Sequence, residues 1–162
     1  MHRGYDDPHC AIARSLEILG DGWTLMILRE AFLGTRRFAD FERHLRISKN
    51  VLSKRLAHLV DEGVFTKVDA GQFGARYEYR LTSKGKDLLT VFTALRQWGD
   101  RWVFGEEREP MLVHDRQTGS PILPVRIRRA DGTPIPSRDL ELRPGPGASD
   151  AQLERWHASQ DD

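Results

Sequence analysis

The sequence predicts a mainly helical α+β fold for most of this 162-residue chain. Three observations indicate this class. Apolar residues recur at helical spacing in several segments before Gly63. Between Val64 and Thr82 the period changes, and two runs rich in β-branched and aromatic residues flank glycines, as in a β-hairpin. A longer apolar stripe then continues as far as Phe104 and indicates one more, long helix.

The composition is that of an ordinary soluble globular protein, with 39% hydrophobic and 30% charged residues. No apolar run approaches the ~18 residues that a membrane span requires, so we expect no membrane contact. The first ten residues lack the apolar segment of a secretory signal. The single cysteine excludes an intramolecular disulfide framework. Together these features lead us to expect a cytoplasmic protein.

Charge is distributed unevenly along the chain. Met1–Phe104 holds 17 Lys/Arg and 13 Asp/Glu, a net charge of +4, whereas the remainder has a net charge of −3. The excess of basic over acidic residues is greatest in Arg36–Lys86, with 12 basic and 6 acidic residues. Such a block can attract nucleic-acid phosphates. Many solvent-exposed faces carry similar counts, so the charge alone does not establish a nucleic-acid partner.

Two helices are expected before the basic block. Cys10–Leu19 has an apolar stripe that ends at Gly20. Asp21 then starts a second helix, WTLMILREAF, which ends before Gly34. The second helix is apolar nearly all round, so we expect it to be central and covered on several sides.

A helix-turn-helix is predicted within Phe38–Gly63. Its second helix begins after Ser48, a favourable N-cap, and stops at Gly63. One face of that helix carries three leucines that need a core, while the opposite face is small, polar and cationic, which suits a DNA major groove. The leucines are Leu52, Leu56 and Leu59, opposite Asn50, Lys54 and Ala57, with Ser53 on the flank. The alternative is that both helices are only scaffold.

The hairpin that follows would make this unit a winged helix. Its arms are VFTKVDA and ARYEYRLT, with Gly71 and Gly74 between them. Arg76 at the tip is a candidate for contact with phosphates or the minor groove, although it is equally compatible with an exposed hairpin charge. For Lys67 and Arg80 on the arms, the solvent-exposed alternative is favoured.

The long helix is capped by Thr82 or Ser83 and carries more apolar surface than a small winged domain can cover. Two tryptophans lie near its end, and exposed aromatic surface of this kind usually marks an interface. We therefore expect a homodimer; the alternative is that the tail folds back over this surface. The expected interface residues are Ile12, Leu16, Leu88, Phe92, Leu95, Trp98 and Trp102.

Composition changes again after the long helix. We expect a domain at 1–104, a Pro- and Gly-rich appendage with a small β-hairpin at 105–148, and a flexible tail at 149–162. The appendage could bury little surface on its own, so it must contact the main domain or a partner.

Several motifs agree in order and spacing with a known family: Gly-Asp-Gly-Trp, Arg-Phe-Ala-Asp-Phe, Ile-Ser-x-x-x-Leu-x-x-x-Leu and Tyr-x-Leu-Thr-x-x-Gly. Over Cys10–Trp102 the chain resembles the HxlR-type winged-helix transcription regulators of bacteria. The resemblance implies a homodimer that binds an inverted-repeat operator in double-stranded DNA through a recognition helix at Ser48–Glu62, as a local repressor or autoregulator. The DNA-binding residues it implies are Arg36, Arg37, Ser48, Lys49, Asn50, Ser53, Lys54 and Arg76.

Cys10 is a candidate redox sensor. A helix N-terminus favours the thiolate, and some members of this family sense thiol-reactive compounds through a cysteine at the matching position. The usual following proline is Ala11 here, and a buried, inert cysteine is the alternative. Some family tails carry cysteine pairs before a closing Gly-Pro-Gly-Ala; Gly145–Ala148 keeps that ending without the cysteines, so the tail is expected to be structural.

The sequence gives little indication of a metal site or of a catalytic site. His9 beside Cys10 is only a pair of adjacent ligands, which does not make a metal site. No phosphate loop or nucleophile motif is present, so we expect no metal, no cofactor and no enzyme. Two further functions remain open: a protein-interaction winged helix, and a regulator that binds a small-molecule effector in a crevice lined by Trp23, Phe92 and Trp98. Those aromatic residues are also compatible with plain core.

Overall fold

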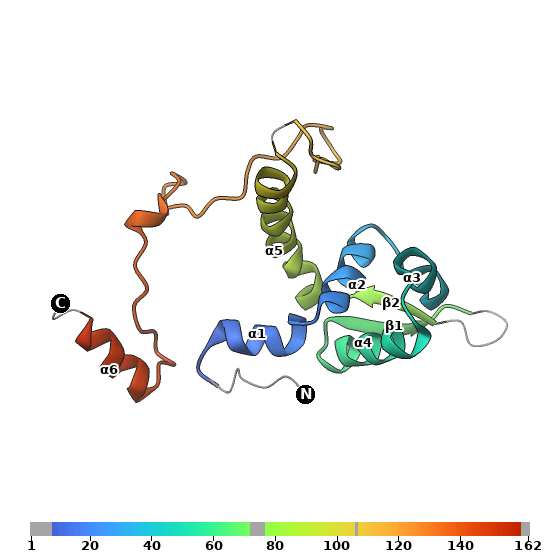
Figure 1. Cartoon of the computed structure of the whole chain (residues 1–162), viewed down its shortest axis with the longest axis horizontal. Helices are drawn as coiled ribbons and strands as arrows, with labels where there is room; N and C mark the ends of the chain where they lie inside the picture. Colours follow the sequence, from blue (N-terminus) through green and yellow to red (C-terminus); the bar gives the residue numbers. More distant parts are fainter. Residues whose placement is uncertain (1–7, 72–76, 106, 160–162) are drawn as a thin grey trace. The chain divides into compact units, whose positions relative to one another are not determined.

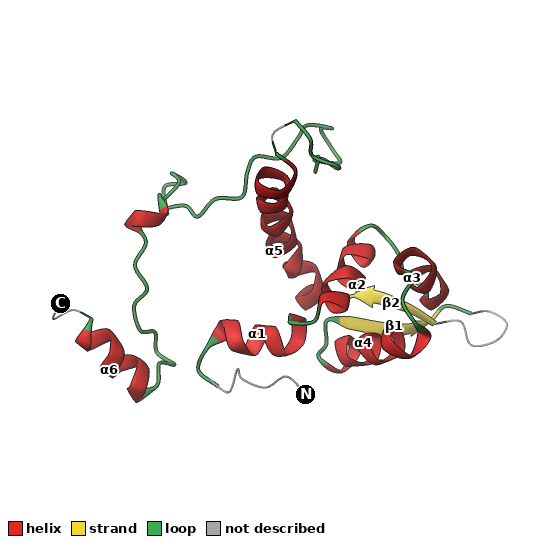
Figure 2. Ribbon diagram, viewed as in Figure 1, coloured by secondary structure: helices red, strands yellow, loops and turns green. Residues whose placement is uncertain are grey.

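The computed structural model describes residues 8–71, 77–105 and 107–159. They form two compact units, Ile18–Val125 and a second unit that combines the N-terminal segment to Glu17 with Arg126–Asp162. Helices dominate, with one antiparallel pair of strands (Figures 1 and 2). The elements are α1 (Ala11–Leu19), α2 (Gly22–Phe32), α3 (Phe38–Leu45), α4 (Lys49–Asp61), β1 (Phe65–Asp69), β2 (Tyr77–Leu81), α5 (Ser83–Gly99), η1 (Asp100–Phe104), η2 (Ser137–Asp139) and α6 (Asp150–Ala158).

The core of the Ile18–Val125 unit lies between α2, α3, α4 and β1. The three leucines predicted for the buried face of α4 are completely inaccessible to solvent. They pack with Phe41 of α3, Ile27 of α2 and Phe65 of β1. The Phe41 and Phe65 rings meet edge to face with centroids 6.4 Å apart. The helix-turn-helix prediction and its core face are therefore confirmed.

Helix α2 is less covered than its sequence indicated. Ile27 and Leu28 are buried, but Trp23 and Met26 are exposed. The expectation of a helix covered on several sides was therefore wrong for these two residues. An all-round apolar sequence shows that a helix has several faces to bury, but not which of them the single chain covers.

The wing is the predicted antiparallel hairpin. β1 and β2 pair from Phe65 opposite Leu81 to Asp69 opposite Tyr77. The segment before α3 extends this sheet, because the Tyr79 amide donates to the Arg36 carbonyl at 2.8 Å and Arg37 forms a bridge with Glu78.

A tight junction connects the end of α4, the start of β1 and the start of α5. Gly63 has a φ of 67°, which favours glycine at this helix stop. Thr82 caps α5 and donates through its hydroxyl to the Gly63 carbonyl at 2.7 Å. Gly85 then passes so close to β1 that a Cβ atom there would lie 2.3 Å from the Val64 carbonyl oxygen. Only glycine fits this crossing without a shift of the backbone.

Helix α5 follows the predicted span, with its last turn replaced by the π-helical turn η1. Two residues expected at a dimer interface, Leu88 and Phe92, are partly buried and pack against the core of their own subunit. The Phe92 ring lies 5.2 Å from that of Phe32, measured between centroids. Three other residues of that set, Leu95 and Trp98 of α5 and Trp102 of η1, are more than half exposed.

The segment after η1 contains the expected hairpin-like structure, as two turns closed by paired backbone hydrogen bonds. His114 bridges Pro121, and Arg128 bridges Pro134 around the predicted Ala-Asp-Gly-Thr turn, but neither bridge extends into a strand among the described residues. The expected flexible tail contains a helix, α6, with a complete capping box between Ser149 and Gln152. A Ser-x-x-Gln spacing in the sequence already carried this signal.

Candidate nucleic-acid interface

Helix α4 has one buried face and one free face. Opposite the core leucines, the side chains near its N-terminus are exposed. Ser48 acts as the N-cap and accepts from the Val51 amide at 3.4 Å, so the first turn begins where the sequence predicted. Because helix N-termini favour phosphate, the exposed cations here lie beside a favourable position for the DNA backbone. The exposed residues of this face are Ser48, Lys49, Asn50, Ser53, Lys54 and Ala57.

A basic residue of α4 that the sequence analysis did not select fixes the helix in place. The Arg55 guanidinium donates to the Asp21 carboxylate at 2.8 Å. Asp21 also caps α2, because its other oxygen accepts from the Trp23 and Thr24 amides. Both side chains of the ion pair are partly buried. Arg55 therefore positions α4 and does not belong to its free face.

Arg36 and Arg37 lie at the edge of the wing sheet, and both are exposed. Arg37 pairs with the half-buried Glu78 at 3.6 Å. The Arg80 guanidinium donates to the same carboxylate at 3.0 Å and holds the pKa of Glu78 below its ordinary value. Within the described residues, Arg36 has no hydrogen-bond or ion-pair partner for its guanidinium, which leaves it available to a phosphate.

The arms of the wing carry further cations. Lys67 lies over the Tyr77 ring, with Nζ 4.0 Å from the centroid. The exposed Arg80 donates to the Glu78 carboxylate. Arg76, the expected contact at the wing tip, lies outside the described residues.

A polar network joins α2 to the segment that leads into the helix-turn-helix. The buried Glu30 accepts from Arg29 at 2.7 Å and from the Thr35 hydroxyl at 3.2 Å, and its carboxylate lies 3.0 Å from His44 Nδ1. Burial raises the pKa of Glu30, but these hydrogen bonds outweigh it and leave the pKa below its ordinary value. The members of this network lie on three separate segments, so no local pattern in the sequence indicates it.

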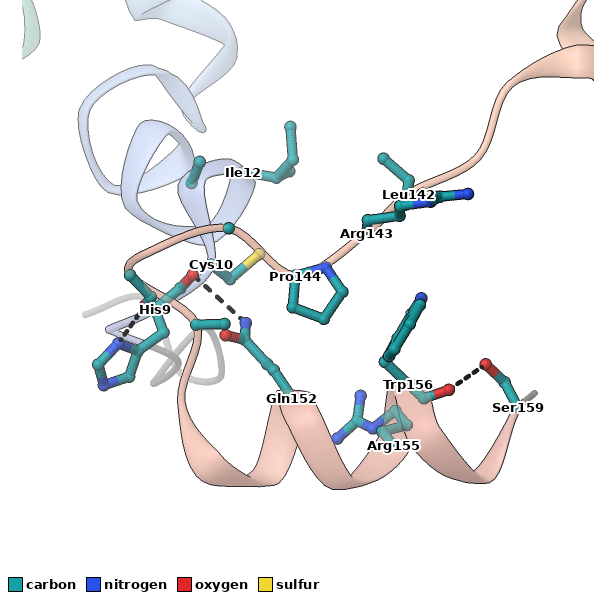
Figure 3. Close-up of a pocket in the computed structure, with 14 residues that line it drawn as sticks. His9, Cys10, Ile12, Leu142, Arg143, Pro144, Gln152, Arg155, Trp156 and Ser159 are labelled. Carbon is teal, nitrogen blue, oxygen red and sulfur yellow. Dashed lines mark hydrogen bonds between the residues drawn. The ribbon is translucent and has the colours of Figure 1, made fainter. Parts of the chain in front are cut away.

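Cys10 belongs to the other compact unit. Its sulfur accepts from the Ala13 amide at 3.4 Å, so the thiol caps α1. The segment before α6 and α6 itself line a cavity of about 810 Å³ beside this cysteine (Figure 3). Gln152 donates to the His9 carbonyl at 3.3 Å and ties α6 to the N-terminal segment. Pro144 and Trp156 contribute apolar walls to the cavity.

Within residues 8–71, 77–105 and 107–159, no three His, Cys, Asp or Glu side chains are grouped so that they could hold a metal ion. None of the described helices combines the length and apolar character needed to cross a membrane.

Comparison with known proteins agrees with this geometry. The chain is 40% identical over 137 residues to Rv3095 of Mycobacterium tuberculosis, named an uncharacterised HTH-type transcriptional regulator, and the match covers 85% of this chain and 87% of that protein. The crystal structure of PA1607, a proposed transcription factor, superposes with a TM-score of 0.78 at 36% identity, covering 86% of this chain and 97% of the other.

A more distant structure is the reduced form of the redox regulator HypR, with a TM-score of 0.53 and 25% identity over 58% of this chain and 96% of that chain. The profile of the HxlR-like helix-turn-helix family matches residues 18–107. That range includes α2 to η1, and thus the whole winged helix described above. The chain belongs to the HxlR-like family of helix-turn-helix transcriptional regulators, which are not enzymes.

Proposed function

We propose that this transcriptional regulator binds an inverted-repeat operator as a homodimer, with α4 as the recognition helix. The observation that carries the proposal is the contrast between the two faces of α4. Three leucines and the Arg55–Asp21 pair hold one face against the domain, while the other is exposed, polar and cationic. A rigidly held helix with a free polar face suits a major groove.

The exposed residues divide by chemistry. Asn50 carries an amide that suits adenine, and Ser53 can pair with several bases. Lys49 and Lys54 are suited to the phosphates beside the groove, as is Arg36 from the edge of the sheet. The proposed interface also includes Arg37, Ser48 and the wing residue Arg76.

The dimer is supported by the free apolar face of α5 and η1. Trp98 is 59% exposed and Trp102 is 66% exposed. Val91 and Leu95 are also exposed, and their spacing places them on the same face, in the preceding turns of the helix. On α1, Ile12 is also exposed. A second copy that covered this surface would bring two recognition helices together in one particle. Operators of helix-turn-helix dimers have half-sites about 34 Å apart.

Cys10 is proposed as the sensing residue. HypR, a relative in structure, is a redox regulator, and the Cys10 thiol caps α1 beside a cavity. Oxidation or alkylation of the sulfur would remove that cap and disturb α1. Because α1 contributes an exposed apolar residue to the proposed dimer surface, a disturbance of α1 would alter the dimer. The spacing of the two recognition helices would then change.

Footprinting on the DNA upstream of the protein's own gene tests the proposal. We expect one protected inverted repeat with half-sites one helical turn apart, and Asn50→Ala should bind it with a preference relaxed at one base pair per half-site. Protection without symmetry, or no binding to any promoter fragment, would contradict it. The second outcome would favour the alternative of a protein-interaction module.

The sensing role has its own test. Diamide oxidises two thiols to one disulfide and is itself reduced to the hydrazine, so with one cysteine per chain the bond would join Cys10 of two copies. We expect this to weaken operator binding by the parent protein and to leave the Cys10→Ser protein unchanged. An equal loss of binding in both proteins would remove Cys10 from the proposal, without affecting the assignment of α4.

A further inference from the structure

A polar pocket of about 400 Å³ lies where α3 meets the β2 edge of the wing. Helix α3 and strand β2 are neighbours in the Ile18–Val125 unit (Figure 1). The charged lining of the pocket comes from the segment before α3, from α3 itself and from β2. Four of these residues are basic and two are acidic: Arg36, Arg37, Arg43, His44, Asp40 and Glu78. The proposed DNA-binding surface therefore contains carboxylates among its cations.

The two carboxylates engage three arginines at this edge. Asp40 accepts from Arg43 at 2.6 Å, as an exposed pair within one turn of α3. Glu78 uses its two oxygens for two different arginines. One oxygen accepts from Nε and Nη2 of Arg80, at 3.2 and 3.0 Å. The other oxygen lies 3.6 Å from Nε of Arg37.

The two arginines on Glu78 are held unequally. Arg80 makes two hydrogen bonds, whereas the Arg37 contact is longer than a hydrogen bond and its side chain is 63% exposed. Only 13% of the Glu78 side chain is exposed, and a buried carboxylate is costly when it has no partner. Arg80 alone can supply that partner. The Arg37 side chain can therefore leave Glu78, while its backbone stays fixed by the bridge to β2.

We propose that Glu78 is a specificity-determining residue, which keeps Arg37 from contacting DNA unless a phosphate lies at one defined position. When α4 reads the operator, base contacts fix the register and bring a phosphate to Arg37. On other DNA the phosphate is out of position, so Arg37 stays with Glu78 and the carboxylate repels the backbone. This inference rests on the proposed function, because it concerns DNA that α4 has bound.

Filter binding of the full chain at several salt concentrations tests this role. The two probes are the footprinted operator and a duplex of the same length with scrambled sequence. Glu78→Gln releases Arg37, so the slope of log affinity against log salt on the scrambled duplex should steepen by roughly one per subunit. On the operator the slope should stay the same, because the parent protein already makes that contact. The affinity ratio of operator to scrambled duplex should therefore fall.

Two control variants separate charge from shape and from net charge. Glu78→Asp keeps the carboxylate on a shorter side chain and should retain the slopes of the parent protein, whereas Glu78→Gln keeps the shape. Asp87→Asn makes the same change of net charge at an exposed position of α5 that does not line the pocket, and should leave both slopes unchanged. Glu78→Asp behaving as Glu78→Gln does, or Asp87→Asn behaving so, would overturn the inference.

Arg37→Gln tests the same role if Glu78→Gln does not fold, which circular dichroism of each sample reports. It should lower the salt slope on the operator by roughly one per subunit and leave the slope on the scrambled duplex unchanged. An equal loss of slope on both probes would mean that Glu78 does not keep Arg37 from other DNA. A parent protein that binds both probes alike would contradict the proposed function, whereas unchanged slopes with operator preference intact would contradict only the role of Glu78.

Discussion

The guanidinium of Arg55 in the middle of α4 donates to the carboxylate of Asp21 at the start of α2, across 34 residues of sequence. The same carboxylate caps α2 by accepting from two backbone amides. One side chain thus fixes the first turn of a core helix and the orientation of the proposed recognition helix. A substitution that weakens the contacts of Asp21 should therefore destabilise both α2 and α4.

Two substitutions at Asp21 separate these roles. Asp21→Asn keeps a good N-cap and loses only the ion pair, so it should lower the free energy of unfolding by about 0.5–1 kcal/mol. Asp21→Ala loses both and should cost about 1–2 kcal/mol. Urea denaturation followed by circular dichroism gives both values. If the two variants lose the same amount, the cap contributes nothing measurable to the stability of α2.

Lys54 is exposed on the proposed DNA-binding face of α4. Lys54→Ala should weaken binding to all DNA sequences and reduce the slope of log affinity against log salt by roughly one, because one phosphate contact is lost. Filter binding at several salt concentrations measures the slope. Arg116→Ala, which removes an exposed cation from the turn after η1, should leave it unchanged; an equal effect of both variants would indicate only a loss of net charge.

The local signals in the sequence were sufficient for most of the winged helix. Ser48, Gly63 and Thr82 mark helix ends in the structure as they do in the sequence, because caps depend on neighbouring residues. The buried leucines of α4 followed from helical periodicity alone. These features involve separations of a few residues, which a single sequence makes visible.

Features that depend on distant partners were not predictable in the same way. Leu88 and Phe92 were expected at a dimer interface because they belong to an apolar stripe, and in the structure they also pack, partly buried, on their own core. Periodicity shows that a face must be buried and does not show what buries it. The Glu30 network was missed for the same reason, since Glu30 and His44 are 14 residues apart and lie on different helices.

The exposed tryptophans of α5 and η1 allow a direct test of the dimer. Trp98→Ser should convert a dimer into a monomer, because it removes a large apolar group from the middle of the proposed interface. Light scattering after size-exclusion chromatography reports the mass. Tyr77→Ser is the matched control, since Tyr77 is also an exposed aromatic residue but lies on β2 of the wing. A parent protein that is already monomeric would contradict the dimer itself.

Two glycines of α5 offer a comparison of close packing with helix propensity. A Cβ atom at Gly85 would lie 2.3 Å from the Val64 carbonyl oxygen, whereas one at Gly99 would meet nothing within 4 Å. Gly85→Ala should therefore destabilise the domain by about 1–3 kcal/mol through overpacking, while Gly99→Ala should stabilise it by up to about 1 kcal/mol. Thermal unfolding of the two variants distinguishes them by the direction of the shift in Tm. A fall in Tm for both would indicate that Gly99 lies in an interface.

The pKa of Glu30 allows a prediction of how the free energy of unfolding depends on pH. Its pKa is lowered in the folded protein, because hydrogen bonds from Arg29, His44 and Thr35 outweigh the effect of burial. A carboxyl group of this kind contributes its full stability above the unfolded pKa of about 4.3, and the contribution is lost as the pH falls through the folded value. Glu30→Gln should therefore cost about 2 kcal/mol at pH 7.

The difference between the parent and Glu30→Gln should then shrink as the pH falls below about 4.3, because the parent loses its advantage there. Urea midpoints measured from pH 7 to pH 3 give both curves, and other carboxylates such as Glu78 act equally on both. A difference that stays constant over this range would mean that Glu30 stabilises the α2–α3 connection through its shape and not through its charge.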